Sequence, residues 1–140
     1  MIDCVFCSIV EGELPSHTVQ ETDDALAFLD ANPLADGHTL VIPKEHHERL
    51  ADVPPGTAEG FYEVLHAVVP AVEAAVDAPA TTVAVNNGEA AGQEVPHVHA
   101  HVVPRFTDDD AGPIHALFGD SPRITEREQD DVADAIANRI

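Results

Sequence analysis

The pattern of hydrophobic and polar positions along the chain predicts five short strands. Four of them are apolar or alternating runs bounded by turn residues, and in the fifth histidine alternates with small apolar residues. The predicted strands cover residues 17–21, 25–30, 38–43, 81–86 and 96–106. A long helical segment separates the third strand from the fourth. This order is typical of an α+β fold with a mainly antiparallel sheet.

Two segments have the pattern of amphipathic helices. Within residues 57–77, apolar side chains recur every three or four positions, the period of one helix face, and Pro70 is expected to bend or interrupt that helix. Thr125 and Glu128 have the spacing of a capping box, which predicts that a final helix begins there. A single helical turn is expected within residues 8–15.

Three histidines, His97, His99 and His101, alternate with apolar residues in the fifth predicted strand. Successive side chains of a strand point to opposite faces, so the three imidazoles should share one face while the apolar residues pack into the core. The strand is expected to end near Pro104, which lacks an N–H. Three imidazoles on one face could hold a catalytic zinc ion with an open position, or one could be a nucleophile that its neighbours orient.

Cys4 and Cys7 are separated by two residues, a spacing typical of metal binding or of redox chemistry. Redox pairs normally open a helix that follows a strand, and no strand precedes Cys4, which favours metal binding. Two thiolates and two imidazoles would complete a common structural zinc site. His97 is a candidate for one imidazole, and His46 or His47 for the other.

The chain carries a formal net charge of −20, and Lys44 is its only lysine. A protein this acidic offers no basic patch for phosphate groups, which argues against a nucleic-acid partner. Self-repulsion of this size weakens a compact state at low salt. In about 1 M salt the Debye length falls to about 3 Å, so the charges hardly interact. The composition therefore favours a halophilic protein from a salt-rich cytoplasm.

The length of 140 residues is sufficient for one domain with its own core, and we expect a single domain over residues 1–140. No apolar run is long enough to cross a bilayer, and no signal peptide precedes the cysteine pair. We therefore expect a cytoplasmic protein with no membrane partner.

The run HVHAHVV at residues 97–103 resembles the His-φ-His-φ-His-φ-φ signature of the histidine triad (HIT) family of nucleotide hydrolases and transferases. The resemblance is wider than this motif. Residues 4–46 are similar to the N-terminal half of the family, and residues 86–105 to its active-site segment. The match thus lies within residues 1–106, whereas residues 107–140, an acidic turn and the final helix, are not diagnostic.

The resemblance implies a five-stranded antiparallel sheet with one long helix and a C-terminal helix, in a two-fold homodimer. It implies that His99 attacks the α-phosphorus of a nucleotide and forms a nucleotidyl-histidine, from which water releases the monophosphate. His101 would contact phosphate oxygens or help to protonate the leaving group. In zinc-carrying relatives the first triad histidine, matched by His97, joins two cysteines and a further histidine in a structural zinc site. Here these would be Cys4, Cys7 and His46.

Further residues match family positions that surround the nucleotide. Two match positions near the ribose and base, one matches an orienting histidine, and three match positions that place polar groups near the phosphate. Asp30 and Asn32 match the positions near the ribose and base, and His38 matches the orienting histidine. The positions near the phosphate are matched by Asn86, Gly92 and Gln93. Glu94 departs from the family, because some relatives have a small hydroxyl residue there that contacts the phosphate.

The sequence therefore predicts a hydrolase of purine nucleoside 5′-phosphoramidates or related adenylates, with a structural zinc ion and no nucleotide cofactor. It has no phosphate-binding loop of the GxxxxGK[ST] type, so imidazoles and backbone N–H groups would carry the chemistry. Three alternatives stay open: a dinucleoside polyphosphate hydrolase, a nucleotide-binding module without turnover, and an enzyme that uses all three triad histidines to hold a catalytic zinc ion.

Overall fold

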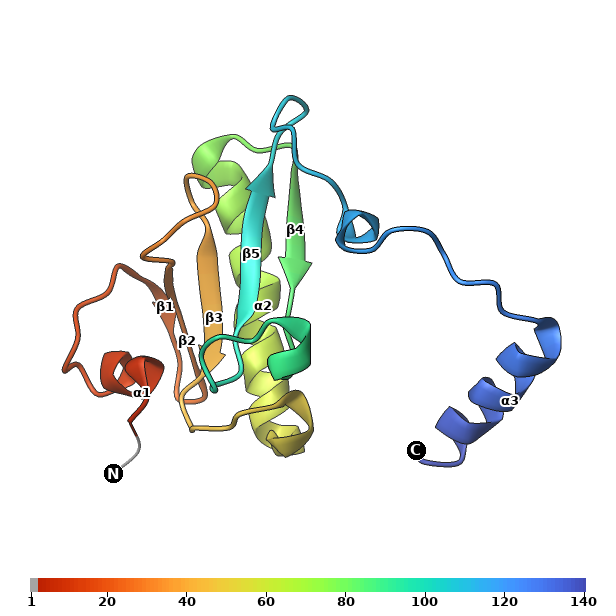
Figure 1. The fold of residues 1–140 in the computed structure, drawn as a ribbon. Coiled ribbons are helices and arrows are strands. Elements are labelled where there is room, and N and C mark those ends of the chain that lie inside the picture. Colours follow the sequence, from red (N-terminus) through yellow and green to blue (C-terminus); the bar gives the residue numbers. More distant parts are fainter. Residues whose placement is uncertain (1–2) are drawn as a thin grey trace. The chain divides into compact units, whose positions relative to one another are not determined.

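The computed structural model describes residues 3–140, which form two compact units (Figure 1). The first ends at Asp110, and the second is Ala111–Ile140. The single domain expected over the whole chain stays a prediction. None of the helices in the described residues is long and apolar enough to span a bilayer.

The first unit is built on a five-stranded antiparallel sheet, which confirms the predicted fold class. The strands lie in the order β1-β2-β3-β5-β4, so the last strand in sequence lies between β3 and β4 (Figure 1). Their bounds are Thr18–Glu21 for β1, Ala25–Leu29 for β2, Thr39–Pro43 for β3, Ala80–Ala84 for β4 and Ala100–Arg105 for β5. The central place of β5 holds the histidine run next to the loops at one end of the sheet.

Regular pairing of β5 begins at Ala100, later than the predicted start at residue 96. The reason lies in the backbone: the N–H of His97 donates to the carbonyl oxygen of Val95, and the N–H of Val98 to that of His47, each at 2.8 Å. These bonds to loops replace the sheet ladder. The predicted alternation nevertheless holds, because Val98 is buried in the core under the long helix while His97 packs against the ring of Phe6 in a second buried cluster.

Helix α2, Pro55–Val76, covers one face of the sheet and buries a stripe of apolar side chains against it. The buried apolar residues of the stripe are Phe61, Val64, Val68 and Val72. The helix begins with a proline in its first turn and ends at Asp77, whose left-handed backbone (φ 55°, ψ 44°) stops it.

The helix continues through Pro70, so the interruption that the sequence suggested does not occur. An internal proline costs about 3 kcal/mol. Val68 and Val72, only 1% and 6% exposed, lie on either side of Pro70 in the sequence and attach both parts of the helix to the core. Burial of two such side chains, at about 1.5 to 3 kcal/mol each, offsets the cost.

The second buried cluster contains α1, Val5–Val10, which lies nearer the N-terminus than the predicted turn within residues 8–15. Cys4 determines where this helix begins, because its Sγ accepts a hydrogen bond from the N–H of Cys7 at 3.4 Å. Phe6 is the buried side chain of α1 and meets Phe28 edge to face, with ring centroids 5.6 Å apart. The cysteine pair is therefore fixed against the sheet by the helix that it opens.

The remaining helices are short or lie in the second unit. Two turns of 3₁₀ helix, η1 (Leu50–Asp52) and η2 (Glu89–Ala91), lie in loops of the first unit. The second unit contains η3 (Ile114–Leu117) and α3 (Glu126–Ala137). Thr125 caps α3 by accepting the N–H of Glu128 at 3.1 Å, which confirms the predicted helix start.

Candidate functional site

Two cysteines and two histidines from distant parts of the sequence converge beside α1. The ligand atoms of Cys4, Cys7, His46 and His97 all lie within 4.8 Å of one another. The Nδ1 atom of His97 lies 3.5 Å from Cys4 Sγ and 3.6 Å from Cys7 Sγ, and His46 Nδ1 lies 3.3 Å from Cys7 Sγ. The structure thus selects His46 as the second imidazole; His47 instead lies with its Nε2 3.6 Å from a carboxylate oxygen of Glu45.

The geometry of this cluster fits a tetrahedral zinc ion. Typical Zn–S and Zn–N bonds place a sulfur and a nitrogen ligand about 3.6 Å apart, which agrees with the three separations above. The Nε2 atom of His97 lies 2.8 Å from the carbonyl oxygen of Pro43 and must donate to it, so Nδ1 presents its lone pair to the sulfur atoms. Burial and the neighbouring Cys4 raise the pKa of Cys7 to about 11, so that thiol needs a nearby cation to ionise.

The middle histidine of the triad is held in a single orientation. The Nδ1–H of His99 donates to the carbonyl oxygen of His97 at 2.7 Å, because a carbonyl can only accept. Its ring packs edge to face on Phe6, with centroids 5.1 Å apart, and the residue is only 7% exposed. In the neutral tautomer that this bond selects, the lone pair lies on Nε2, the nitrogen that a nucleophile would use.

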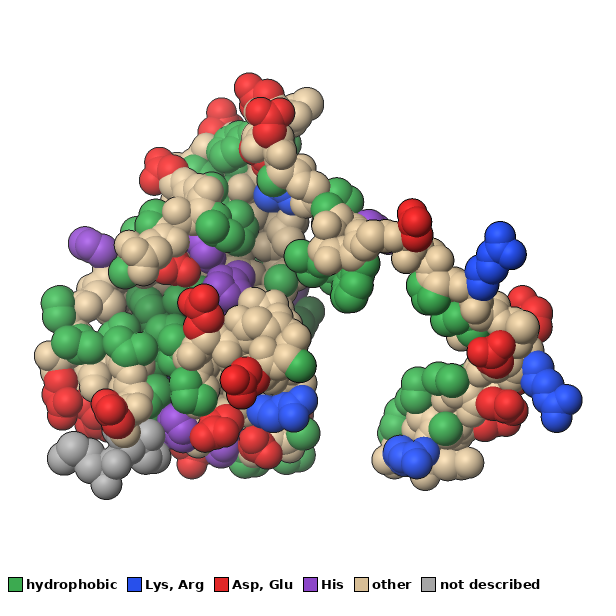
Figure 2. All heavy atoms as spheres, viewed as in Figure 1, with side chains coloured by type: hydrophobic (Ala, Val, Ile, Leu, Met, Phe, Trp, Pro, Cys, Tyr) green, Lys and Arg blue, Asp and Glu red, His purple; other side chains and the backbone are tan. Residues whose placement is uncertain are grey.

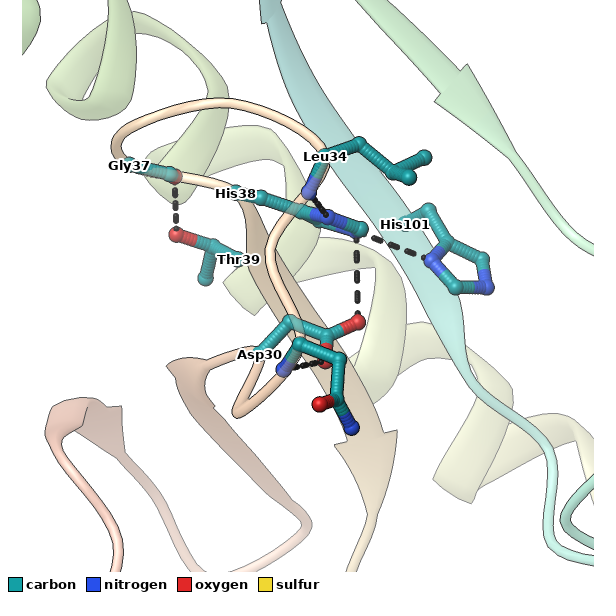
Figure 3. Close-up of polar contacts among 7 residues, drawn as sticks. Asp30, Leu34, Gly37, His38, Thr39 and His101 are labelled. Carbon is teal, nitrogen blue, oxygen red and sulfur yellow. Dashed lines mark hydrogen bonds and ion pairs between the residues drawn. The ribbon is translucent and has the colours of Figure 1, made fainter.

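A second polar cluster joins the end of β2, the start of β3 and the first part of β5 (Figure 3). The Nε2 atom of His38 lies 3.0 Å from Nδ1 of His101 and 3.5 Å from Oδ2 of Asp30. The Nδ1 atom of His38 accepts the N–H of Leu34 at 3.0 Å. This cluster adjoins His99, since the rings of His99 and His101 have centroids 5.1 Å apart.

Burial keeps both histidines of this second cluster neutral near pH 7. It lowers the pKa of His38, although the carboxylate of Asp30 acts in the opposite direction. Burial also lowers the pKa of His101; the neighbouring His99 and His38 lower it further, and Asp30 raises it. Each ring therefore carries a single proton.

The three triad histidines do not point toward a common metal position. Among the described residues, two clusters have side chains close enough to bind one metal ion, and neither contains His99. They are Cys4/Cys7/His46/His97 and Asp30/His38/His101. Both ring nitrogens of His97 already have partners: Nδ1 faces the sulfur atoms, and Nε2 donates to the carbonyl oxygen of Pro43. The arrangement therefore favours the nucleophile hypothesis over the catalytic zinc hypothesis.

The loop before the triad is held together by Gln93, whose amide contacts only backbone atoms. Its Oε1 accepts the N–H of Gly88 at 2.8 Å, and its Nε2 donates to the carbonyl oxygens of Glu48 and Val95 at 2.7 and 3.0 Å. The side chain that was predicted to lie near the phosphate thus joins its own loop to the loop after β3. Gly92 has a φ of 94°, a backbone conformation that favours glycine.

Two other predicted binding residues follow different strands: Asn32 lies in the loop between β2 and β3, and Asn86 lies in the loop after β4, at the opposite end of the sheet. Asn32 is exposed and donates its N–H to Oδ1 of Asp30 at 2.9 Å, and Asn86 is half-buried after β4. The sequence analysis did not identify Phe6, whose ring contacts both His97 and His99. Its position between the two cysteines was the available signal, because a metal site that holds Cys4 and Cys7 also places the residue between them.

Comparison with known proteins decides the family. A family model described as the HIT domain matches residues 11–108. The chain belongs to the HIT family. A crystal structure of a HIT family member from Bacillus subtilis superposes with a TM-score of 0.86 at 31% identity, covering 99% of this chain and 98% of that one. The five-stranded sheet with its long helix and C-terminal helix is thus the HIT fold.

Two further relatives have names that state a ligand or an activity. A zinc-bound histidine triad protein from Mycobacterium smegmatis has a TM-score of 0.74 and 39% identity, covering 91% of this chain and 86% of that one. The adenosine 5′-monophosphoramidase of Saccharomyces cerevisiae is 39% identical over 102 residues, which are 73% of this chain and 62% of that protein.

Proposed function

We propose that this HIT protein hydrolyses purine nucleoside 5′-phosphoramidates or related adenylates through a covalent intermediate on His99. The observation that carries the proposal is the hydrogen bond from Nδ1 of His99 to the carbonyl oxygen of His97, which places the lone pair of the neutral ring on Nε2. A buried neutral imidazole with one nitrogen anchored and the other open is an effective nucleophile near pH 7. The chain is a nucleotide hydrolase that acts on P–N or P–O bonds.

The reaction has two steps. In the first, the lone pair of His99 Nε2 attacks the α-phosphorus, the bond from phosphorus to the leaving nitrogen breaks, and the amine takes up a proton as it departs. In the second, water attacks the same phosphorus, the bond from phosphorus to Nε2 breaks, and the monophosphate and one proton are released. The Nε2 lone pair is thereby restored.

The name of the yeast relative supports a phosphoramidate as the substrate class. Glu94 is exposed, and a carboxylate in this loop disfavours an anionic polyphosphate as leaving group more than an amine. A dinucleoside polyphosphate hydrolase is therefore the second candidate. A binding module without turnover is the third, and the anchored nucleophile disfavours it.

The other predicted binding residues have proposed positions around this centre. Asp30 and Asn32 would lie near the ribose and base, and Asn86 and Gly92 near the phosphate. The glycine lets the phosphate approach the backbone closely, and backbone N–H groups there stabilise charge without a metal ion.

The sulfur and imidazole cluster is proposed as a structural zinc site. Cys4, Cys7, His46 and His97 would hold the ion, and its charge would keep the thiolates ionised. These residues join α1, the loop after β3 and the segment before β5, so the ion would hold the backbone of His97 in place. That backbone carbonyl is the one that orients His99.

Two properties of the whole protein are also proposed. The edge strand β4 carries an exposed Val83, 45% accessible, and within residues 3–140 no strand pairs with its outer side, which supports a two-fold homodimer. Acidic side chains are spread over the visible face of the first unit, where basic ones are few (Figure 2). This distribution and the charge of −20 support function at high salt.

Trapping the intermediate tests the proposed function. Wild-type protein, mixed with an adenosine 5′-phosphoramidate in molar KCl and quenched in base, should gain the mass of one adenylyl group on the peptide that contains His99. The His99→Ala variant should gain none, while the variant His66→Ala, changed at an exposed histidine on α2, should behave as wild type. Label on another residue, or turnover without label, contradicts the proposal.

A further inference from the structure

The direction of the hydrogen bonds around His38 follows from its surroundings. A backbone N–H can only donate, so Nδ1 of His38 accepts from Leu34 and carries no proton. The single proton of this neutral ring is therefore on Nε2. Figure 3 shows that this edge of the ring faces both His101 and Asp30. His38 is only 2% exposed, so its ring has little contact with solvent.

The proton on His38 in turn fixes the state of His101. The Nε2–H of His38 donates to Nδ1 of His101 at 3.0 Å, so the proton of His101 is on its own Nε2, on the side of the ring away from His38 (Figure 3). In this state His101 presents an N–H donor to the region beside the nucleophile. The titratable groups that face His101 are His38, His99 and Asp30.

Asp30 is suited to hold this arrangement because a carboxylate accepts at both oxygens. Its Oδ1 accepts the N–H of Asn32 at 2.9 Å, which fixes the carboxylate in place. Its Oδ2 is left 3.5 Å from Nε2 of His38, and the side chain is only 18% exposed. An asparagine could keep the bond from the N–H of Asn32, but it would remove the negative charge beside the Nε2–H of His38 and turn an NH₂ group toward it.

Asp30, His38 and His101 have the spacing of a metal site, but their hydrogen bonds disfavour metal binding. A metal ion on Nε2 of His38 would displace the proton from that nitrogen. The proton would have to move to Nδ1, where the N–H of Leu34 already points. A neutral His38 therefore cannot bind a metal ion without breaking its bond to the backbone.

From these contacts we infer that Asp30 is a positioning residue for catalysis: through His38 it holds His101 with its Nε2–H directed into the active site. This role goes beyond contact with a ribose. It rests on the proposed function only for its kinetic consequence, since the tautomer of His101 is a property of the free protein.

The first test is an NMR spectrum of the imidazole nitrogens of the protein as purified, with the His101 signals identified by their loss in His101→Gln. In wild type His101 should carry its proton on Nε2, and in Asp30→Asn the share of this tautomer should fall. The control is Asp36→Asn, which removes an exposed carboxylate from the same loop and should leave the spectrum unchanged. A wild-type His101 with its proton on Nδ1, or an unchanged tautomer in Asp30→Asn, overturns the inference.

The second test separates positioning from ribose contact by removing the ribose hydroxyls. Asp30→Asn should lower kcat about ten- to a hundred-fold, the range for losing a hydrogen bond to a charged group, with both adenosine and 2′,3′-dideoxyadenosine phosphoramidates. A loss confined to the adenosine substrate would show that Asp30 acts only on the ribose. If wild type releases no AMP, the proposed function fails, and the tautomer measurement alone decides the role of Asp30.

Discussion

His99 donates a 2.7 Å hydrogen bond from Nδ1 to the carbonyl oxygen of His97, so a residue of the proposed zinc site orients the proposed nucleophile. The imidazole of His97 faces the two cysteines while its backbone faces His99. The proposed metal binding and the proposed catalysis would thus use different parts of the same residue. This separation leads to distinct predictions for removal of the metal and for changes in the active site.

Removal of zinc should lower stability far more than chemistry. A ligand that binds only the folded state contributes about 4 kcal/mol when present at a thousand times its dissociation constant. We therefore expect a strong chelator to lower the Tm of the protein by about 5 °C or more, and added zinc to restore it. AMP release should persist at temperatures where the chelated protein stays folded. Loss of all activity in the folded chelated protein would indicate a catalytic metal instead.

Replacement of Gln93 should loosen the loop before the triad. Gln93→Ala removes three contacts to the backbone, which should cost about 1 to 3 kcal/mol in the free energy of unfolding. Hydrogen exchange at the amide of Gly88 should become faster, because that N–H loses its acceptor. Gln20→Ala, at an exposed position in β1, is the control. Unchanged protection of the Gly88 amide would refute this role for Gln93.

Stability should fall as the pH falls below about 6.5. Burial lowers the pKa values of His38, His97 and His101 in the folded protein, so below the normal histidine pKa the unfolded chain binds more protons than the folded one. The loss should continue until the pH reaches the lowered folded-state values. Urea unfolding between pH 8 and pH 5 measures it, with the exposed-site variant His66→Ala as control. A free energy of unfolding that is constant or rises in this range is the contrary result.

The stability of the protein should rise with salt. Raising KCl from 0.1 M to about 1 M shortens the Debye length from about 10 Å to about 3 Å and screens the mutual repulsion of the acidic side chains. We expect the Tm to rise by about 5 °C or more over this range. Repeating the scan in NaCl separates screening from a specific effect of potassium. A Tm that stays constant in both salts would contradict the halophilic interpretation.

The sequence alone predicted the strands, because each has an apolar run or alternation that a half-buried sheet requires. It also predicted that the histidines and the apolar residues between them face different sides. It did not predict where β5 begins, since the bond from the Val98 N–H to the carbonyl of His47 joins segments far apart in sequence. The continuity of α2 through Pro70 likewise depends on packing against the sheet.

In the candidate site, too, the sequence predicted the residue types but not the contacts between distant segments. Residue types and spacing indicated candidate zinc ligands but left both His46 and His47 open. The family resemblance favoured His46, and the fold agrees, because the side chains of these two neighbouring residues face different ways. The contacts of Gln93 and the direction of the hydrogen bonds around His38 depend on backbone groups. Nearly every residue has the same backbone groups, so the sequence does not indicate which of them make these bonds.

The most direct test of the account is AMP release from an adenosine 5′-phosphoramidate in molar KCl, comparing wild type, His99→Ala and His66→Ala. The account predicts release by wild type and His66→Ala, and a loss of at least about a thousand-fold in His99→Ala, the scale expected when a nucleophile is removed. Equal release by all three proteins would show that His99 is not the nucleophile and would contradict the account.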